Sequence, residues 1–221
     1  MELDSVQISV ERLGAAALDY EILLGLPPGS RDGVVRFQLG RGAVELKQGA
    51  PSERLLRFVS PTLQRPRIDS FFGVAVRIDP PQHQPEPALR RPDAALAIDH
   101  VVIQTTDPER AISLWRDTHG LRLAFDKEFP ERGLRLLFFR SAEITLEYAA
   151  PYPPAPSDDP DRFHGISYRV PSIERAHARL KDVGVEVSEV RPGHRPNSSV
   201  CTVRSGTCGV ATLLIEVRGD T

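Results

Sequence analysis

The spacing of apolar and polar residues in the C-terminal half follows an order that occurs twice. Residues 100–105 alternate and are rich in β-branched side chains, which predicts a half-buried strand. Asp107 and Pro108 then open a stretch with helical spacing that ends at Gly120, as an N-cap residue, a first helical proline and a terminating glycine would. Three short apolar segments follow, near residues 121–127, 134–140 and 143–149. This order predicts a strand, a helix and three strands.

The same order returns sixty-five residues later. Nine positions separate His100 from Glu109 in the first unit, and nine separate Gly165 from Glu174 in the second. The second helix is predicted to begin after Ser172. Its strands are expected at residues 165–170 and near 185–190, 199–204 and 211–217. Self-similarity at a fixed period indicates a repeated structural unit.

The N-terminal half contains a weaker copy of this unit. Ser5 lies twenty residues before Gly25, and a strand carrying Glu45 follows. Residues 54–78 resemble the beginning of a further copy. We therefore expect an α+β protein of repeated βαβββ modules, with a degenerate N-terminal pair and a complete C-terminal pair. The expected boundaries are a domain at 1–80, a proline-rich linker at 81–96, and a domain at 97–221 with modules 97–150 and 160–218.

Composition excludes several classes of partner. The 221-residue chain has 40% hydrophobic and 26% charged residues and a formal net charge of −2, so nucleic acid and anionic membranes are not expected partners. No apolar run approaches the roughly 20 residues that span a bilayer. The N-terminus lacks the pattern of a secretory signal, and Cys201 and Cys208 form no metal motif. A cytoplasmic protein that binds a small molecule, with a homodimer as one possible state, is expected.

Alternation along the strands decides which side chains share a face. On the first strand of the 97–150 module, His100 and Gln104 lie together, opposite the apolar side that the helix would cover. The closing strand of this module carries Thr145 and Glu147 on one face. A carboxylate among apolar strand residues is costly to bury unless it is paired or bound to a metal.

The last module has its own candidates. Ser167 and Arg169 share a face of the first strand, and Glu216 lies on the closing strand. Arg169 has two interpretations that stay open here: a bidentate clamp on an anionic substrate group, or a partner that neutralises Glu216. His100, Glu147 and Glu216 on one concave face would form a divalent metal site of imidazole and carboxylate type.

These residues resemble the vicinal oxygen chelate superfamily, which contains glyoxalases, bleomycin-resistance proteins, methylmalonyl-CoA epimerases and extradiol dioxygenases. The resemblance covers residues 97–218 well and residues 1–78 loosely. It implies that two modules pair into an eight-stranded cup, with metal ligands on the first and last strand of each module. His100, in the sequence DHVV, matches the first-strand ligand. Glu147 matches the last-strand ligand, and Glu216 matches its equivalent in the second module.

The chain departs from the family pattern at one ligand position. Gly165 stands where the family usually has histidine, and His164 lies one residue too early. A slip of one residue or a bulge in this strand would make His164 a ligand. Without it, the chain has either a three-ligand site or no metal.

The resemblance implies a divalent-metal-dependent lyase, isomerase or epimerase that acts on a small oxygen-chelating metabolite. The metal would be Zn, Ni, Mn or Fe, acting as a Lewis acid, with Glu216 or Glu147 as the base. Two alternatives remain: a metal-free protein that sequesters a small molecule, and an extradiol-type dioxygenase. Four residues are expected to contact the substrate: Arg169, Ser167, Gln104 and Thr145.

Overall fold

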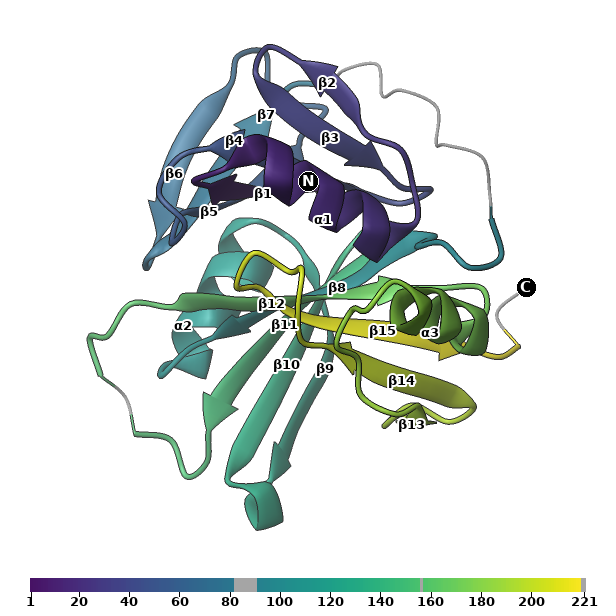
Figure 1. Ribbon diagram of the computed structural model, residues 1–221. Helices are drawn as coiled ribbons and strands as arrows, with labels where there is room; N and C mark the ends of the chain where they lie inside the picture. Colours follow the sequence, from purple (N-terminus) through teal and green to yellow (C-terminus); the bar gives the residue numbers. More distant parts are fainter. Residues whose placement is uncertain (82–90, 156, 220–221) are drawn as a thin grey trace. The chain divides into compact units, whose positions relative to one another are not determined.

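The computed structural model describes residues 1–81, 91–155 and 157–219 (Figure 1). The chain is an α+β protein whose strands form two mixed sheets of βαβββ-like modules, as the sequence predicts. Two compact units can be distinguished and are described separately. The first comprises Met1–Asp4, Arg54–His83 and His100–His164, and the second comprises Ser5–Glu53, Gln84–Asp99 and Gly165–Thr221.

Four copies of the module follow one another, and the strands and helices of each are given in chain order. Copy 1 contains β1 (Glu2–Val10), α1 (Leu13–Leu24), β2 (Gly29–Arg31), β3 (Val34–Gln38) and β4 (Ala43–Gln48). Copy 2 contains only β5 (Arg54–Val59), β6 (Arg67–Phe71) and β7 (Val74–Asp79). Copy 3 contains β8 (Ala97–Gln104), α2 (Pro108–Ile112), the π-helical η1 (Ser113–Thr118), β9 (Arg122–Phe129), the 3-10 turn η2 (Pro130–Arg132), β10 (Leu134–Ser141) and β11 (Ile144–Pro151). Copy 4 contains β12 (Arg162–Arg169), α3 (Ile173–Asp182), β13 (Arg191–Pro192), β14 (Ser198–Val203) and β15 (Ala211–Val217).

Strand pairing is the same in the three complete copies. The first strand lies parallel to the last, as β8 does to β11, β1 to β4 and β12 to β15. The last strand then pairs antiparallel with the one before it, and that strand with the second. A parallel pair requires a crossover connection, which the helix of each copy provides.

The predicted helix caps lie at equivalent positions in copies 3 and 4. The side chain of Asp107 accepts a 3.0 Å hydrogen bond from the backbone of Arg110, and Ser172 accepts one of 3.3 Å from Arg175. Each cap residue satisfies an N–H group that has no partner within its helix. The N-cap Asp107 lies seven residues after His100, as Ser172 does after Gly165.

One predicted strand is absent. Residues 185–190 make only an isolated bridge, between Val187 and Val203, and β13 has two residues. The Oγ atom of Ser188 accepts the N–H of Thr202 at 2.9 Å, in place of a strand carbonyl, and Pro192 has no N–H to donate. The predicted linker lies largely outside the described residues.

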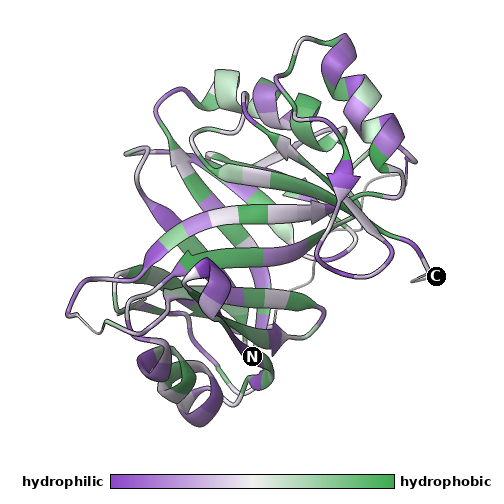
Figure 2. Cartoon of the chain, turned by 90° about the horizontal axis from the view of Figure 1, so that it is seen from below, coloured by the Kyte–Doolittle hydropathy of each residue, from purple (hydrophilic) through white to green (hydrophobic). Residues whose placement is uncertain are grey.

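Hydropathy alternates along the strands, so each sheet has an apolar face (Figure 2). In the first unit this face packs around Trp115, whose indole N–H donates a 2.7 Å hydrogen bond to the Tyr148 hydroxyl. The ring of Phe58 lies 5.4 Å from that of Trp115. In the second unit the Tyr20 hydroxyl donates to the Thr207 carbonyl at 3.2 Å. No helix in the described ranges is long and apolar enough to cross a bilayer.

Candidate functional site

An imidazole and a carboxylate meet on one face of β8 and β11 in the first unit. His100 on β8 pairs with Thr145 on β11, and Glu147 lies two residues further along β11, so all three share a face. The Nε2 atom of His100 lies 3.7 Å from Oε2 of Glu147. Their side chains are 14% and 20% exposed, so the pair is shielded but reachable.

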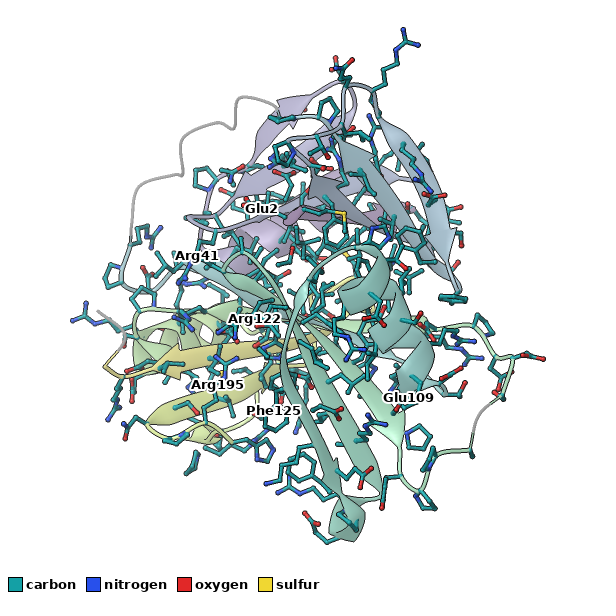
Figure 3. The ribbon with its side chains drawn as sticks, turned by 180° about the vertical axis from the view of Figure 1, so that it is seen from behind. Glu2, Arg41, Glu109, Arg122, Phe125 and Arg195 are labelled. Atoms are coloured by element: carbon teal, nitrogen blue, oxygen red, sulfur yellow. The ribbon has the colours of Figure 1, made fainter. Side chains whose placement is uncertain are left out.

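Residues on β10 extend the same face, and the next strand, β9, carries Arg122 and Phe125 (Figure 3). Arg140 lies opposite Thr145 and donates a 2.9 Å hydrogen bond from Nη1 to its hydroxyl. Phe138 lies opposite Glu147 and is half-buried. Gln104 is exposed at the end of β8. Two of the predicted substrate-contacting residues, Thr145 and Gln104, thus lie on the face that carries His100.

Gly165 occupies the position of His100 in copy 4, as predicted. A Cβ atom added to Gly165 would lie 2.3 Å from the backbone oxygen of Ala211, so the packing leaves no room there for a side chain. His164 is exposed at the strand entrance. Copy 4 therefore offers no histidine at the position that corresponds to His100.

The strand registers show which residue corresponds to Glu147. In copy 3, Glu147 lies two residues beyond the β11 partner of His100. In copy 4, Gly165 pairs with Ala211 on β15. Leu213 therefore occupies the position that corresponds to Glu147, and Glu216 lies three residues later, on the other side of the strand.

Glu216 lies on the side of β15 that faces α3. Its Oε2 atom accepts a 2.9 Å hydrogen bond from the N–H of Ile173, the first residue of α3, and its Oε1 accepts one of 3.1 Å from Nε of Arg218. An anion at a helix N-terminus satisfies unpaired N–H groups and interacts favourably with the helix dipole. These contacts give Glu216 a structural role, and its assignment as a metal ligand or base stays an untested prediction.

Arg169 forms an ion pair with Asp99, which is neither of its two expected partners, a substrate anion and Glu216. Its Nη2 atom lies 2.9 Å from Oδ1 of Asp99, whose carboxylate also contacts Arg195 at 3.2 Å. The Asp99 side chain is 2% exposed, and two guanidinium groups offset the loss of its hydration. The Ser167 hydroxyl is buried and has no hydrogen-bond partner in the described part of the chain.

Copy 1 keeps the glutamate but pairs it with an arginine. Ser5 pairs with Ala43 on β4, so Glu45 corresponds to Glu147. Arg36 on β3 lies directly opposite Glu45, at the position that Phe138 holds in copy 3. Its Nη1 atom lies 2.5 Å from Oε1 of Glu45, which is 3% exposed. The carboxylate of copy 1 is therefore neutralised and buried.

His100 and Glu147 are the two side chains of this face that could bind a metal ion. Two ligands about 2.1 Å from a tetrahedral ion are about 3.4 Å apart, so His100 and Glu147, at 3.7 Å, are close enough to share one. Catalytic zinc sites use three protein ligands. Among residues 1–81, 91–155 and 157–219, no group of three or more His, Cys, Asp or Glu side chains is placed to hold an ion. His100 and Glu147 alone therefore do not complete a metal site.

Residues 99–202, which include the His100–Glu147 pair, match the sequence model of the Glyoxalase/Bleomycin resistance protein/Dioxygenase superfamily. This part of the chain is therefore similar to members of that superfamily. None of the curated proteins matches the chain.

Solved structures are similar to part of this chain at low identity. Methylmalonyl-CoA epimerase from Mycobacterium tuberculosis is 21% identical, covering 56% of this chain and 89% of that chain, with a TM-score of 0.47. A hypothetical protein from Bacillus halodurans is 22% identical over 56% of this chain and 96% of its own, with a TM-score of 0.47. A variant of Streptomyces coelicolor methylmalonyl-CoA epimerase in complex with 2-nitronate-propionyl-CoA is 21% identical, covering 57% and 97%, with a TM-score of 0.46. Similarity at this level carries no information about activity.

Sequence reasoning missed part of the candidate site in residues 99–202. The sequence pattern predicts no role for Arg140, Arg122 or Phe125, and it predicts that Phe138 or Phe139 lies in the core. Phe139 is fully buried but Phe138 is not. Alternation along 134–140 was the available signal, because it places Phe138 and Arg140 on the same face.

Proposed function

We propose that the chain is an enzyme of the lyase or isomerase type, in which Glu147 and His100 move a proton on a small metabolite with neighbouring oxygens. The observation that carries this proposal is the 3.7 Å separation of Nε2 of His100 from Oε2 of Glu147 on a sheet face where both side chains remain partly exposed. A carboxylate and an imidazole within reach of one substrate atom suit general base and acid catalysis.

The proposed step is proton abstraction next to a carbonyl or carboxylate group. The carboxylate of Glu147 takes the proton, and the electron pair of the broken C–H bond moves onto the substrate oxygen as an enolate. His100 and Arg140 lie on the same face and would stabilise the negative charge. Returning a proton to the same carbon from the other side gives an epimer, and returning it to a neighbouring atom gives an isomer.

A divalent metal remains part of the expectation from the superfamily. Bound to substrate oxygens, such an ion would acidify the neighbouring C–H group. The described residues supply His100 and Glu147 as donors. Zn, Ni, Mn and Fe are therefore tested directly, by elemental analysis of the purified protein and by thermal unfolding with each added ion.

A second candidate function is binding without catalysis, as in a small-molecule sequestering protein. The observation in its favour is the half-exposed Phe138, whose ring stacks on that of Phe125 with centroids 4.8 Å apart. Aromatic surface of this kind is typical of ligand pockets. An extradiol dioxygenase would use two histidines and a carboxylate, whereas this face carries one histidine.

Solvent exchange tests the proposal. The protein is incubated in D₂O with a panel of 2-substituted and 2-oxo carboxylic acids, with and without each metal, and loss of the exchangeable proton signal is followed by NMR. We expect exchange with at least one compound and a loss of about 100-fold or more in Glu147→Gln. Exchange at the wild-type rate in this variant would overturn the assignment of the base. Binding without exchange would favour the sequestering protein.

A further inference from the structure

Four polar residues form a row across the strands of copy 3. His100 on β8 pairs with Thr145 on β11, Thr145 lies opposite Arg140 on β10, and Arg140 lies opposite Arg122 on β9. Directly paired residues point to the same side of a sheet. The row therefore places an imidazole, a hydroxyl and two guanidinium groups side by side.

A β-bulge brings Arg122 into this row. The pairing of β9 and β10 shifts between Phe138 and Phe139, so that Phe125 lies opposite Phe138 while Arg122 lies opposite Arg140. Regular alternation would put Arg122 and Phe125, three residues apart, on opposite faces. The extra residue in β9 places both on the face of Glu147.

Two like charges directly opposite one another destabilise a sheet. In the described ranges neither Arg122 nor Arg140 forms an ion pair, and Arg140 donates only to the Thr145 hydroxyl. Arg135, on the other face of β10, is treated differently: its guanidinium pairs with Asp126 at 2.8 Å and with Glu109 at 2.7 Å. Arg135 is thus neutralised by carboxylates on one face of the sheet, whereas the charges of Arg122 and Arg140 on the other face are not.

The neighbouring row on this face is aromatic. Phe138 and Phe125 lie opposite each other, with ring centroids 4.8 Å apart and planes inclined by 24°. Both side chains are half-buried, so part of each ring remains accessible to a ligand. Rows on one face of a strand are about 7 Å apart, roughly the length of a small aromatic acid.

We propose that Arg122 and Arg140 bind the oxyanion group of the ligand, a carboxylate or phosphate, while a flat apolar body lies on Phe138 and Phe125. The proposal deepens the proposed function, on which it rests for the place of the reacting carbon beside Glu147. Guanidinium groups bind carboxylate and phosphate oxygens through paired N–H donors. Such an anion would also relieve the repulsion between the two arginines.

Calorimetry on the full chain tests the proposal with four probes: 2-naphthoate, 2-naphthyl phosphate, 2-naphthamide and inorganic phosphate. We expect one of the two aromatic anions to bind at least about tenfold more tightly than the uncharged amide, and inorganic phosphate alone to bind weakly. Which anion binds better distinguishes a carboxylate from a phosphate ligand. Equal binding of the amide, or no binding of either anion at millimolar concentration, would overturn the proposal.

Variants locate the binding. Arg122→Gln and Arg140→Gln are each expected to raise the Kd of the preferred anion about tenfold, and Phe125→Leu to weaken all aromatic probes. Arg122 is exposed on the strand, so Arg122→Gln should fold even if Arg140→Gln does not. The matched control is Arg132→Gln, in the η2 turn of the same hairpin and 52% exposed. Wild-type affinity in Arg122→Gln would contradict the proposal.

Failure of this proposal is distinguishable from failure of the proposed function. Glu147→Gln should keep the affinity for the aromatic anion, because Glu147 lies in the aromatic row and makes no contact that the anion needs. Arginine-dependent binding without proton exchange in any compound would retain the anion site and reject the enzyme. Proton exchange that depends on Glu147 but shows a wild-type KM in Arg122→Gln would retain the enzyme and reject the anion site.

Discussion

The Glu216 carboxylate accepts a 2.9 Å hydrogen bond from the backbone N–H of Ile173, the first residue of α3. The closing strand of copy 4 is thereby tied to the start of its own helix. We predict that Glu216→Ala lowers the free energy of unfolding by about 1 kcal/mol, because it leaves a helix N–H group without its acceptor. Urea unfolding measures this loss. Glu189→Gln, at a side chain that is 84% exposed, is the control and should be neutral.

The same variant separates two roles of Glu216. If it only holds the helix, Glu216→Ala retains the ligand affinity and any metal affinity of the wild type below its melting temperature. Loss of metal binding with an unchanged melting temperature would instead make it a ligand.

Glu147→Gln and His100→Gln should abolish proton exchange while the fold persists. Both replacements keep the approximate shape of the side chain and remove its acid–base capacity, for which losses of about 10² to 10⁴ are typical. The side chains are partly exposed, so we expect changes in unfolding free energy within about 1 kcal/mol. Glu131→Gln, in the exposed η2 turn, is the control. A variant that unfolds at 25 °C would not support a catalytic role.

Tyr148→Phe should destabilise the first unit. The Trp115 indole N–H donates to the Tyr148 hydroxyl at 2.7 Å, and both side chains are fully buried. Removing the acceptor leaves a buried donor unpaired, which costs about 1–3 kcal/mol. Chemical denaturation measures the change, with Tyr152→Phe, outside the core, as the comparison. An unaltered midpoint would show that another group accepts the indole N–H.

His119 should make stability depend on pH. Burial beside Phe71 and Trp115, followed by the nearby Arg67, lowers the pKa of His119 below its ordinary value of 6.5, although Asp69 acts in the opposite direction. The unfolded chain therefore binds a proton more readily than the folded one. Stability is full above pH 6.5 and falls as the pH drops below this value.

Replacing the imidazole tests this linkage. His119→Gln should show a smaller fall in unfolding free energy between pH 7.5 and 5.5 than the wild type, measured by urea titration at each pH. Parallel profiles for the two proteins would exclude His119 as the source.

The sequence predicted the modules and their helices well because those signals are local. Asp107, Ser172 and Gly120 act through their own backbone neighbours, so the residue type alone indicates the cap or the stop.

The parts of the site that depend on strand pairing could not be predicted in this way. The repeat and the family resemblance match Glu216 to Glu147 as the carboxylate of the closing strand, but the register of β12 and β15 gives that position to Leu213. A one-residue change in alignment exchanges the two faces of a strand, and nothing in the sequence of one strand specifies its partner. The bulge that turns Arg122 toward Arg140 was unpredictable for the same reason.

Glu45 and Glu147 differ in the residue that lies opposite them on the adjacent strand. Both glutamates occupy the same position, but one faces Arg36 and the other faces Phe138. The carboxylate of copy 1 is thus neutralised by a cation on the adjacent strand, whereas that of copy 3 faces an aromatic ring. If Glu147 is the proposed base, an arginine introduced by Phe138→Arg should pair with it, as Arg36 pairs with Glu45, and should suppress proton exchange.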